Sequence, residues 1–106
     1  MKKVNAIILI LLTALAARAT AQSSPAKDLY AGKCAVCHAA DGSANTSVGK
    51  SLKIPNFHSV DVQNQSDADL KTMITKGKGA MPTFAGKLTD AQIDQMVTYI
   101  RGLGKK

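Results

Sequence analysis

The sequence predicts an all-α fold in which three to four helices are joined by long loops. Three segments repeat their apolar residues with the spacing of one helix face. No segment alternates apolar and polar residues as a half-buried strand would. Of the 106 residues, the first 21 have the pattern of a removable leader. One small domain, residues 22–106, therefore remains to fold.

The leader has the three parts of a secretory signal peptide. Lysines follow Met1, a mostly apolar run covers residues 4–17, and small residues close it at Ala19-Thr20-Ala21. The run is shorter than the roughly 20 apolar residues that span a membrane, although an uncleaved anchor stays open as an alternative. We expect cleavage near Ala21 (a cut after Ala19 is the other candidate), export to the periplasm and no membrane span afterwards.

The first predicted helix runs from about Pro25 to Cys37. Proline fits the first turn of a helix because a backbone N–H at that position would have no partner within the helix, so its absence costs nothing. Two rows of residues then follow at helical spacing. They are Leu29, Lys33 and Val36 in one row and Tyr30, Cys34 and Cys37 in the other.

The second predicted helix covers about Asp67 to Lys76. Ser66 precedes it as an N-cap, Asp69 completes a short capping box, and Gly77 ends it. Leu70, Met73 and Ile74 form its apolar face, on which we expect Met73 to fill core space.

The third predicted helix follows the capping box Thr89-Asp90-Ala91-Gln92. Leu88 and Ile93 stand at the positions of a hydrophobic staple, and Gly102 is its expected end. Its apolar stripe consists of Ile93, Met96, Val97 and Ile100. Between the first two helices, residues 39–65 show no convincing periodicity, which is acceptable if this loop wraps a ligand.

The composition suggests that the domain needs a non-protein group in its core. An 85-residue chain buries little apolar surface, and this one has no Trp and two cysteines only three positions apart. Without the leader, eleven basic and seven acidic side chains give a net charge of +4. No long basic run interleaved with aromatic residues is present, so we expect no nucleic-acid partner.

The pentapeptide Cys34-Ala35-Val36-Cys37-His38 carries the chemistry. Two cysteines one helical turn apart can both form thioether bonds to a haem, and the histidine that follows them can bind its iron. A thioredoxin-like redox pair would need a strand before Cys34. A zinc site would need two further ligands, and His58 is the only other histidine.

With its motifs and their spacing, the chain resembles a class I c-type cytochrome of the short bacterial, cytochrome c6-like, monohaem type. The resemblance covers nearly all of residues 22–106. It implies a small cytochrome c fold around one covalent haem c, with Leu29, Tyr30 and Tyr99 near the crossing of the terminal helices. Ala26 is a departure, since many relatives have glycine there. The matching parts are Leu29-Tyr30, the Cys34–His38 motif, Gly42, the loop from Gly77 to Phe84, and Tyr99-Ile100.

The resemblance implies Met81, followed by Pro82, as the second axial iron ligand. A thioether is a soft ligand suited to haem iron, and a neighbouring proline stiffens the loop that holds it. His58 is the rival, which would give bis-His ligation. The family also points to the Pro55 carbonyl as the acceptor of a hydrogen bond from His38, although Pro55 could equally mark a turn.

A haem with both axial positions filled by protein has no open site for a substrate, so we expect an electron carrier and not an enzyme. Its partners would be periplasmic or membrane redox proteins that dock on a lysine-rich haem edge, and we expect a monomer. The candidate docking residues are Lys33, Lys76, Lys78 and Lys87. Two alternatives stay open: a five-coordinate haem c peroxidase-like enzyme or gas sensor, and a haem-free CxxC thiol–disulfide protein.

Overall fold

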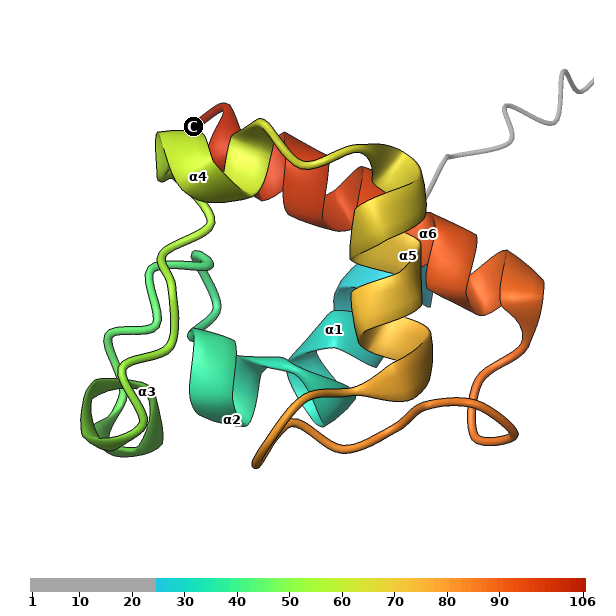
Figure 1. Cartoon of the computed structure of the whole chain (residues 1–106), viewed down its shortest axis with the longest axis horizontal. Helices are drawn as coiled ribbons and strands as arrows, with labels where there is room; N and C mark the ends of the chain where they lie inside the picture. Colours follow the sequence, from blue (N-terminus) through green and yellow to red (C-terminus); the bar gives the residue numbers. More distant parts are fainter. Residues whose placement is uncertain (1–24) are drawn as a thin grey trace, which may run out of the picture.

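The computed structural model describes residues 25–106, and the expected signal peptide and its cleavage site lie outside them. The described residues contain six helices and no strand, so the all-α prediction is confirmed (Figure 1). The helices are α1 (Pro25–Lys33), α2 (Ala35–His38), α3 (Ser47–Ser51), α4 (Val60–Gln63), α5 (Asp67–Lys76) and α6 (Asp90–Gly104).

The first predicted helix is divided into α1 and α2 by a bend at Cys34. The backbone of Cys34 has φ −119° and ψ −38°, outside the usual range of an α-helix. Its amide still donates to the Tyr30 carbonyl at 2.8 Å. The chain therefore changes direction here while the Cys34 amide keeps its helical hydrogen bond, a bend that residue spacing alone does not reveal.

The predictions for α5 and α6 are confirmed by their caps. Ser66 and Asp69 form a complete capping box at α5, and Thr89 and Gln92 form one at α6. Each box satisfies two backbone amides that the first helical turn leaves without partners. The end of α6 differs, because the helix continues past Gly102 to Gly104 and buries Leu103 on the way.

The predicted loop at residues 39–65 contains two short helices, α3 and α4, and is not structureless. Each begins with a hydroxyl cap. The Thr46 side chain accepts from the Gly49 amide, and the Ser59 side chain accepts from the Val62 amide. Helices of four or five residues are too short to show an apolar period, so a search for periodicity misses them.

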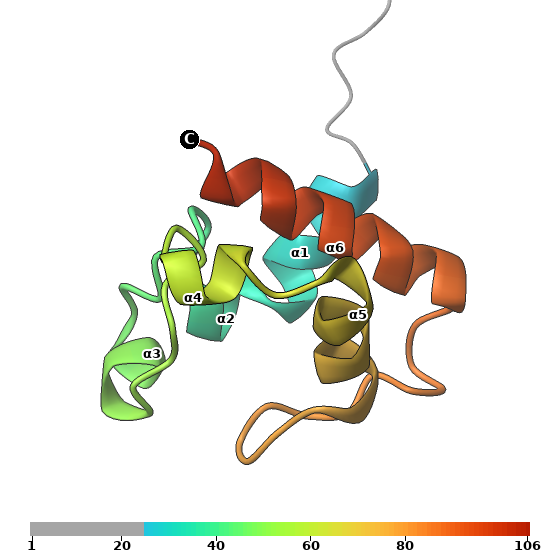
Figure 2. The same ribbon diagram turned by 45° about the horizontal axis from the view of Figure 1, so that its top comes forward.

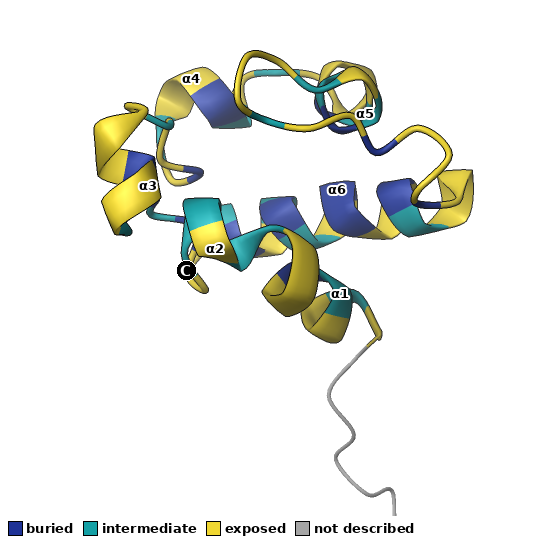
Figure 3. Cartoon of the chain, turned by 90° about the horizontal axis from the view of Figure 1, so that it is seen from below, coloured by how far each residue is buried: buried dark blue, intermediate teal, exposed yellow. Residues whose placement is uncertain are grey.

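The core lies between α6 and the helices that contact it. α6 packs against α1 and α5, and Figure 2 shows it crossing over α1. In Figure 3 the buried residues of α6 lie on the side facing the interior of a ring formed by the other elements. The buried apolar cluster consists of Tyr30, Phe57, Val62, Leu70, Ile74, Phe84, Leu88, Ile93, Met96, Val97, Ile100 and Leu103.

The crossing of α1 and α6 is built as the resemblance implied. The rings of Tyr30 and Tyr99 lie 4.9 Å apart between their centroids, and Leu29 and Ala26 pack against the core cluster. Met96 is fully buried, as expected of a core residue. Met73 is only half-buried, outside the cluster, so its expected role as a core filler is wrong.

None of the helices within residues 25–106 combines the length and apolarity that crossing a bilayer requires.

Candidate functional site

The two cysteines stand at the bend between α1 and α2. Both are free and half-buried. The amides of Cys37 and His38 donate to the Cys34 carbonyl at 3.2 and 3.0 Å, which closes one helical turn between the cysteines. Side chains three positions apart on such a turn lie on the same face. The predicted pair of thioether positions is therefore compatible with the local backbone.

Burial, together with the nearby Cys37, raises the pKa of Cys34 to about 11. Its thiol is thus protonated at neutral pH. A redox-active CxxC protein works through a thiolate with a lowered pKa, and among the described residues no strand precedes Cys34. Both observations argue against the thiol–disulfide alternative.

The carbonyls of residues 37–39, at the end of α2, are engaged by neighbouring segments. The Thr46 hydroxyl donates to the Cys37 carbonyl at 2.8 Å, and the Ala44 amide donates to the His38 carbonyl at 2.9 Å. The buried Tyr30 hydroxyl donates to the Ala39 carbonyl at 2.7 Å. The last carbonyls of a helix need partners outside it, and these bonds fix the backbone on which His38 stands.

Gly49 allows α3 to lie directly against this backbone. A Cβ at Gly49 would come within 2.7 Å of the Cys37 carbonyl oxygen and 2.9 Å of the Thr46 hydroxyl. Such contacts are too short for any other residue. The close packing of α3 on α2 therefore depends on a glycine that the sequence pattern did not single out.

The His38 ring is half-buried and makes no hydrogen bond to the described residues. Its Nδ1 atom is buried without a partner. Desolvation lowers the pKa of His38 below its ordinary value, so the imidazole is neutral at neutral pH. A neutral imidazole with uncommitted nitrogens is the form that binds a metal ion, and it directly follows two free thiols. The residues present therefore fit a covalently attached haem.

A buried aromatic ring lies against His38. The rings of His38 and Phe57 are stacked, with centroids 4.6 Å apart and planes 23° from parallel. Sequence analysis did not assign Phe57 to the site. His38 ends α2 and Phe57 lies in the loop between α3 and α4, so only the three-dimensional structure brings them together.

The two other residues considered for the site in the 55–58 segment are exposed. The structure contains no hydrogen bond between His38 and the Pro55 carbonyl, so that role stays a prediction. The ring of His58 bonds through Nε2 to the Asp41 carbonyl at 2.9 Å. This contact ties two loops together and occupies one of the nitrogens that the rival bis-His arrangement could use.

Met81 lies on the segment 77–88 between α5 and α6. The Thr83 hydroxyl and the Ala85 amide donate to the Thr75 carbonyl at 2.6 and 3.1 Å, and the Phe84 amide donates to the Ile74 carbonyl at 3.2 Å. The segment is thereby tied to the end of α5. Met81 is half-buried and, like Cys34, packs against the hydrophobic core.

Comparisons with known proteins agree with this arrangement. Residues 21–100 match the family model described as cytochrome C oxidase, cbb3-type, subunit III. The chain is 32% identical to a cytochrome c6 of Picosynechococcus, over 94% of this chain and 92% of the relative. It is 36% identical to a cytochrome c6 of Thermosynechococcus vestitus, over 92% of this chain and 85% of the relative.

One solved structure is also similar. It is titled KustC0563 c-type cytochrome and aligns with a TM-score of 0.68 at 30% sequence identity. The alignment covers 74% of this chain and 95% of that structure.

Proposed function

The chain belongs to the class I c-type cytochromes, and from that membership we propose that it is a periplasmic one-electron carrier with His38 and Met81 as axial iron ligands. That it carries one covalent haem c and transfers electrons, and is not a catalyst, follows from the family. The location, the ligand pair and the partners are the parts proposed here.

The observation that carries the proposal is the neutral, half-buried His38 imidazole with uncommitted nitrogens, directly after two free thiols. Cys34 and Cys37 would hold the haem by thioether bonds, and His38 would bind its iron. When bound, the haem supplies an iron that changes between Fe(III) and Fe(II). The contacts around residues 37–39 keep the protein backbone in place, which limits rearrangement when the charge changes.

Met81 is proposed as the second axial ligand. Its support is the segment that carries it, which is tied to α5 and leaves the side chain half-buried against the core. Excluding water from the iron and supplying a thioether would both raise the reduction potential. Met73, half-buried on α5, is the natural comparison because it is a methionine outside this segment.

Absorption spectra of the exported protein test the ligand pair. We expect a covalent, low-spin haem with the weak far-red band of a thioether bound to ferric iron. Met81→His should abolish that band and lower the potential, whereas Met73→Leu should change neither. An unchanged potential in Met81→His would remove Met81 from the iron. A high-spin spectrum of the unmodified protein would favour the five-coordinate enzyme or sensor.

We also propose that the Pro55 carbonyl accepts a hydrogen bond from His38 Nδ1 once the imidazole is bound to iron. The support is proximity along the chain, because Pro55 lies two residues before Phe57, whose ring contacts His38. Such a bond would fix the tautomer and raise the basicity of the ligand.

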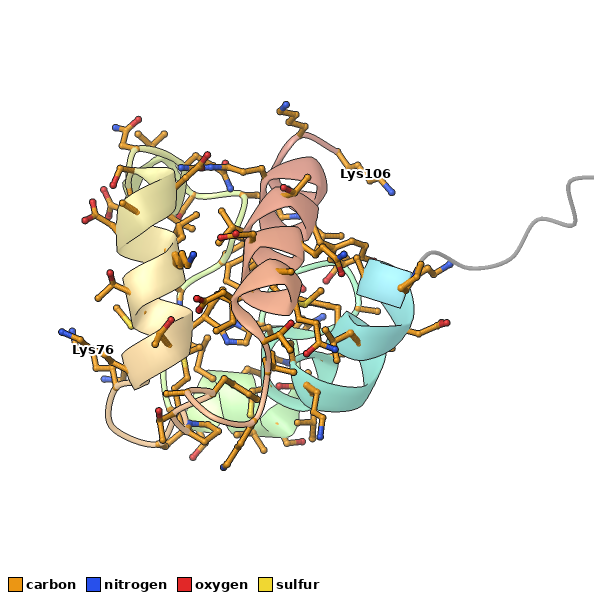
Figure 4. All side chains as sticks on the ribbon, turned by 90° about the vertical axis from the view of Figure 1, so that its right-hand side faces the viewer. Lys76 and Lys106 are labelled. Carbon is orange, nitrogen blue, oxygen red and sulfur yellow. The ribbon has the colours of Figure 1, made fainter. Side chains whose placement is uncertain are left out.

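Four exposed lysines are proposed to dock an acidic redox partner. They flank the cysteine motif and the Met81 segment and are Lys33, Lys76, Lys78 and Lys87. Other basic residues form the ion pairs with Asp94 and Asp67: Lys71 pairs with Asp94, and Arg101 pairs with Asp67. Figure 4 shows Lys76 and Lys106 projecting outward at opposite ends of the molecule.

This placement provides a matched pair of variants. Lys76→Gln should slow oxidation by an anionic reagent such as ferricyanide and weaken its dependence on ionic strength. Lys106→Gln, which removes the same charge elsewhere, should have a much smaller effect. Equal effects of the two variants would mean that only net charge matters and that no docking edge exists.

Export and the mature form are proposed from the sequence pattern of residues 1–21. The amino-terminal sequence of the periplasmic protein should begin at Gln22. We propose that residues 22–106 work as a monomer, for which size-exclusion chromatography with light scattering is the direct measurement.

A further inference from the structure

We propose that Phe57 is a positioning residue for His38, whose stacked ring fixes the plane of the imidazole. The inference rests on the proposed function, because it concerns the orientation of the residue proposed as an iron ligand. It adds a role for three residues, Phe57, Gln63 and Arg101, that the cysteine motif does not include.

First, the plane of the His38 ring is fixed only if a contact restrains its rotation. Rotation about the bond from Cβ to the ring of histidine has broad energy minima, so the torsion itself sets no sharp orientation. The hydrogen bond proposed above from Nδ1 to the Pro55 carbonyl would restrain the ring at one edge, and in the structure His38 makes no hydrogen bond to the described residues. The stacked Phe57 ring, 4.6 Å away and 23° from parallel, is the planar contact that the structure shows. Turning the imidazole out of this plane would drive its edge into the Phe57 face.

The second step concerns the position of Phe57 itself. The residue is 9% exposed and belongs to the core cluster. Its amide donates to the Gly42 carbonyl at 2.8 Å. Gly42 has φ +77°, and a Cβ there would stand 2.8 Å from Cδ2 of the Phe57 ring. The ring therefore rests directly on the backbone of the loop that follows α2.

The third step connects Phe57 to α6. The Gln63 side-chain amide donates to the Phe57 carbonyl at 2.5 Å. Arg101 in turn donates through Nη1 to the Gln63 backbone carbonyl at 2.9 Å and to its Oε1 at 3.4 Å. The Arg101 Nε atom donates to the Asp67 carboxylate at 2.8 Å, and its Nη2 atom donates to the Gln65 carbonyl.

Arg101 suits this position because its planar fork offers several donors in fixed directions, which a lysine cannot do. Its side chain is 21% exposed, whereas that of Asp67 is 76% exposed. The guanidinium therefore donates mainly to two part-buried carbonyls, those of Gln63 at the end of α4 and of Gln65 just after it. The result is a continuous series of contacts from α6, through Gln63 and the Phe57 backbone, to the face of His38.

The orientation of an axial imidazole has a spectroscopic signature that simple destabilisation lacks. In an oxidised low-spin haem, the imidazole plane and the orientation of the second axial ligand together set how the unpaired spin is distributed over the ring. While the second ligand is unchanged, the pattern of hyperfine-shifted haem methyl resonances in the proton NMR spectrum therefore reports the imidazole plane. A residue that only stabilises the fold would leave the pattern unchanged.

The experiment compares holoprotein variants by this spectrum and by thermal unfolding. Phe57→Leu removes the ring but keeps an apolar side chain, and Phe57→Tyr keeps a ring. Gln63→Leu removes the anchor of the Phe57 backbone without touching the ring. Ile93→Ala is the control, because Ile93 is buried, at 1% exposed, but lies far from Gln63. The end of α6 that approaches Gln63 is Gly104. Ile93 is eleven residues away from Gly104, about 16 Å along the helix.

We expect Phe57→Leu to change the order of the haem methyl resonances. Gln63→Leu should shift the resonances in the same direction by less. Phe57→Tyr, which keeps a ring, should keep the original order. Ile93→Ala should lower the unfolding temperature and leave the order intact. The inference is overturned if Phe57→Leu and Gln63→Leu, measured as folded holoproteins, both keep the original pattern. Failure of the proposed function is distinguishable, because the unmodified protein would then show either no hyperfine-shifted His38 signals or the spectrum of a high-spin, five-coordinate haem.

Discussion

Replacing Gly77 by alanine should displace the segment that carries Met81. Gly77 ends α5 with φ +70°. A Cβ there would meet the Met81 carbonyl oxygen and would stand 2.7 Å from the carbonyl carbon of Pro82. Gly79, two residues later, has φ +57° but no atom within 4 Å of its Cβ position. Gly77→Ala and Gly79→Ala therefore both place a side chain at a positive φ. They differ in the contact, and Gly77 also has ψ 179°, a conformation that is essentially restricted to glycine.

The structure allows the two costs to be separated. An alanine at the positive φ of Gly79 costs about 1–2 kcal/mol. At Gly77, where ψ is 179°, the backbone cost is about 1–3 kcal/mol. Ordinary Cβ contacts begin at 3.4 Å, so Gly77→Ala must also move the Pro82 backbone by about 0.7 Å. Such overpacking adds about 1–3 kcal/mol. The expected loss is about 2–6 kcal/mol for Gly77→Ala and about 1–2 kcal/mol for Gly79→Ala.

Two measurements on the same holoproteins check this reasoning. Thermal unfolding should separate the variants, since 1 kcal/mol corresponds to roughly 4–8 °C in a domain of this size. The far-red band of the thioether–iron bond should weaken in Gly77→Ala and persist in Gly79→Ala. Equal unfolding temperatures and equal bands would refute the argument, because they would show that the close approach of Gly77 to Met81 and Pro82 has no consequence.

Three other substitutions have defined outcomes. Gly102→Ala should raise stability by about 0.5–1 kcal/mol, because a Cβ there meets nothing and the helix gains a better helix former; a lower unfolding temperature would contradict this. Thr89→Ala should cost about 1 kcal/mol in chemical denaturation by removing the cap on the Gln92 amide, while Thr98→Ala serves as the exposed control. Burial, reinforced by nearby Cys34, Tyr99 and Asp41, raises the pKa of Tyr30 well above its ordinary 10.0. The folded chain therefore keeps a proton that the unfolded chain releases, and stability should fall as the pH rises above 10. Tyr30→Phe should show a weaker decline, measured by unfolding on either side of pH 10.

The parts of the fold that sequence predicted well are those with local chemical markers. α5 begins and ends where Ser66, Asp69 and Gly77 indicate, because the capping box and the glycine act within one turn of the helix. The end of α6 depends instead on burial of Leu103 against the rest of the domain. α3 and α4 were missed because each is a single capped turn without a period.

The residues of the site also differ in whether a local sequence pattern predicts them. Cys34, Cys37 and His38 lie within five consecutive residues, so their spacing alone predicts the chemistry proposed for them. The contact between Phe57 and His38 joins α2 to the loop between α3 and α4, and no local pattern encodes it. One clue to its anchor was present in the sequence. Arg101 is the only arginine of residues 22–106, among ten lysines, which indicates a position where a planar, multidentate cation is needed.

The few contacts that attach the segment 77–88 allow it to open locally, without unfolding of the whole domain. It contains no helix, and Phe84 and Leu88 are its only buried apolar side chains. Apart from the Gly77 amide, which donates to the Met73 carbonyl at 2.8 Å where α5 ends, its bonds to α5 lie at the carbonyls of Ile74 and Thr75. Detaching these few contacts frees the whole segment while α6 stays packed on α1. The amides of Phe84 and Ala85 should therefore exchange with solvent together, at a free energy below that of global unfolding. If Met81 is the axial ligand proposed above, its exchange would be governed by this local opening.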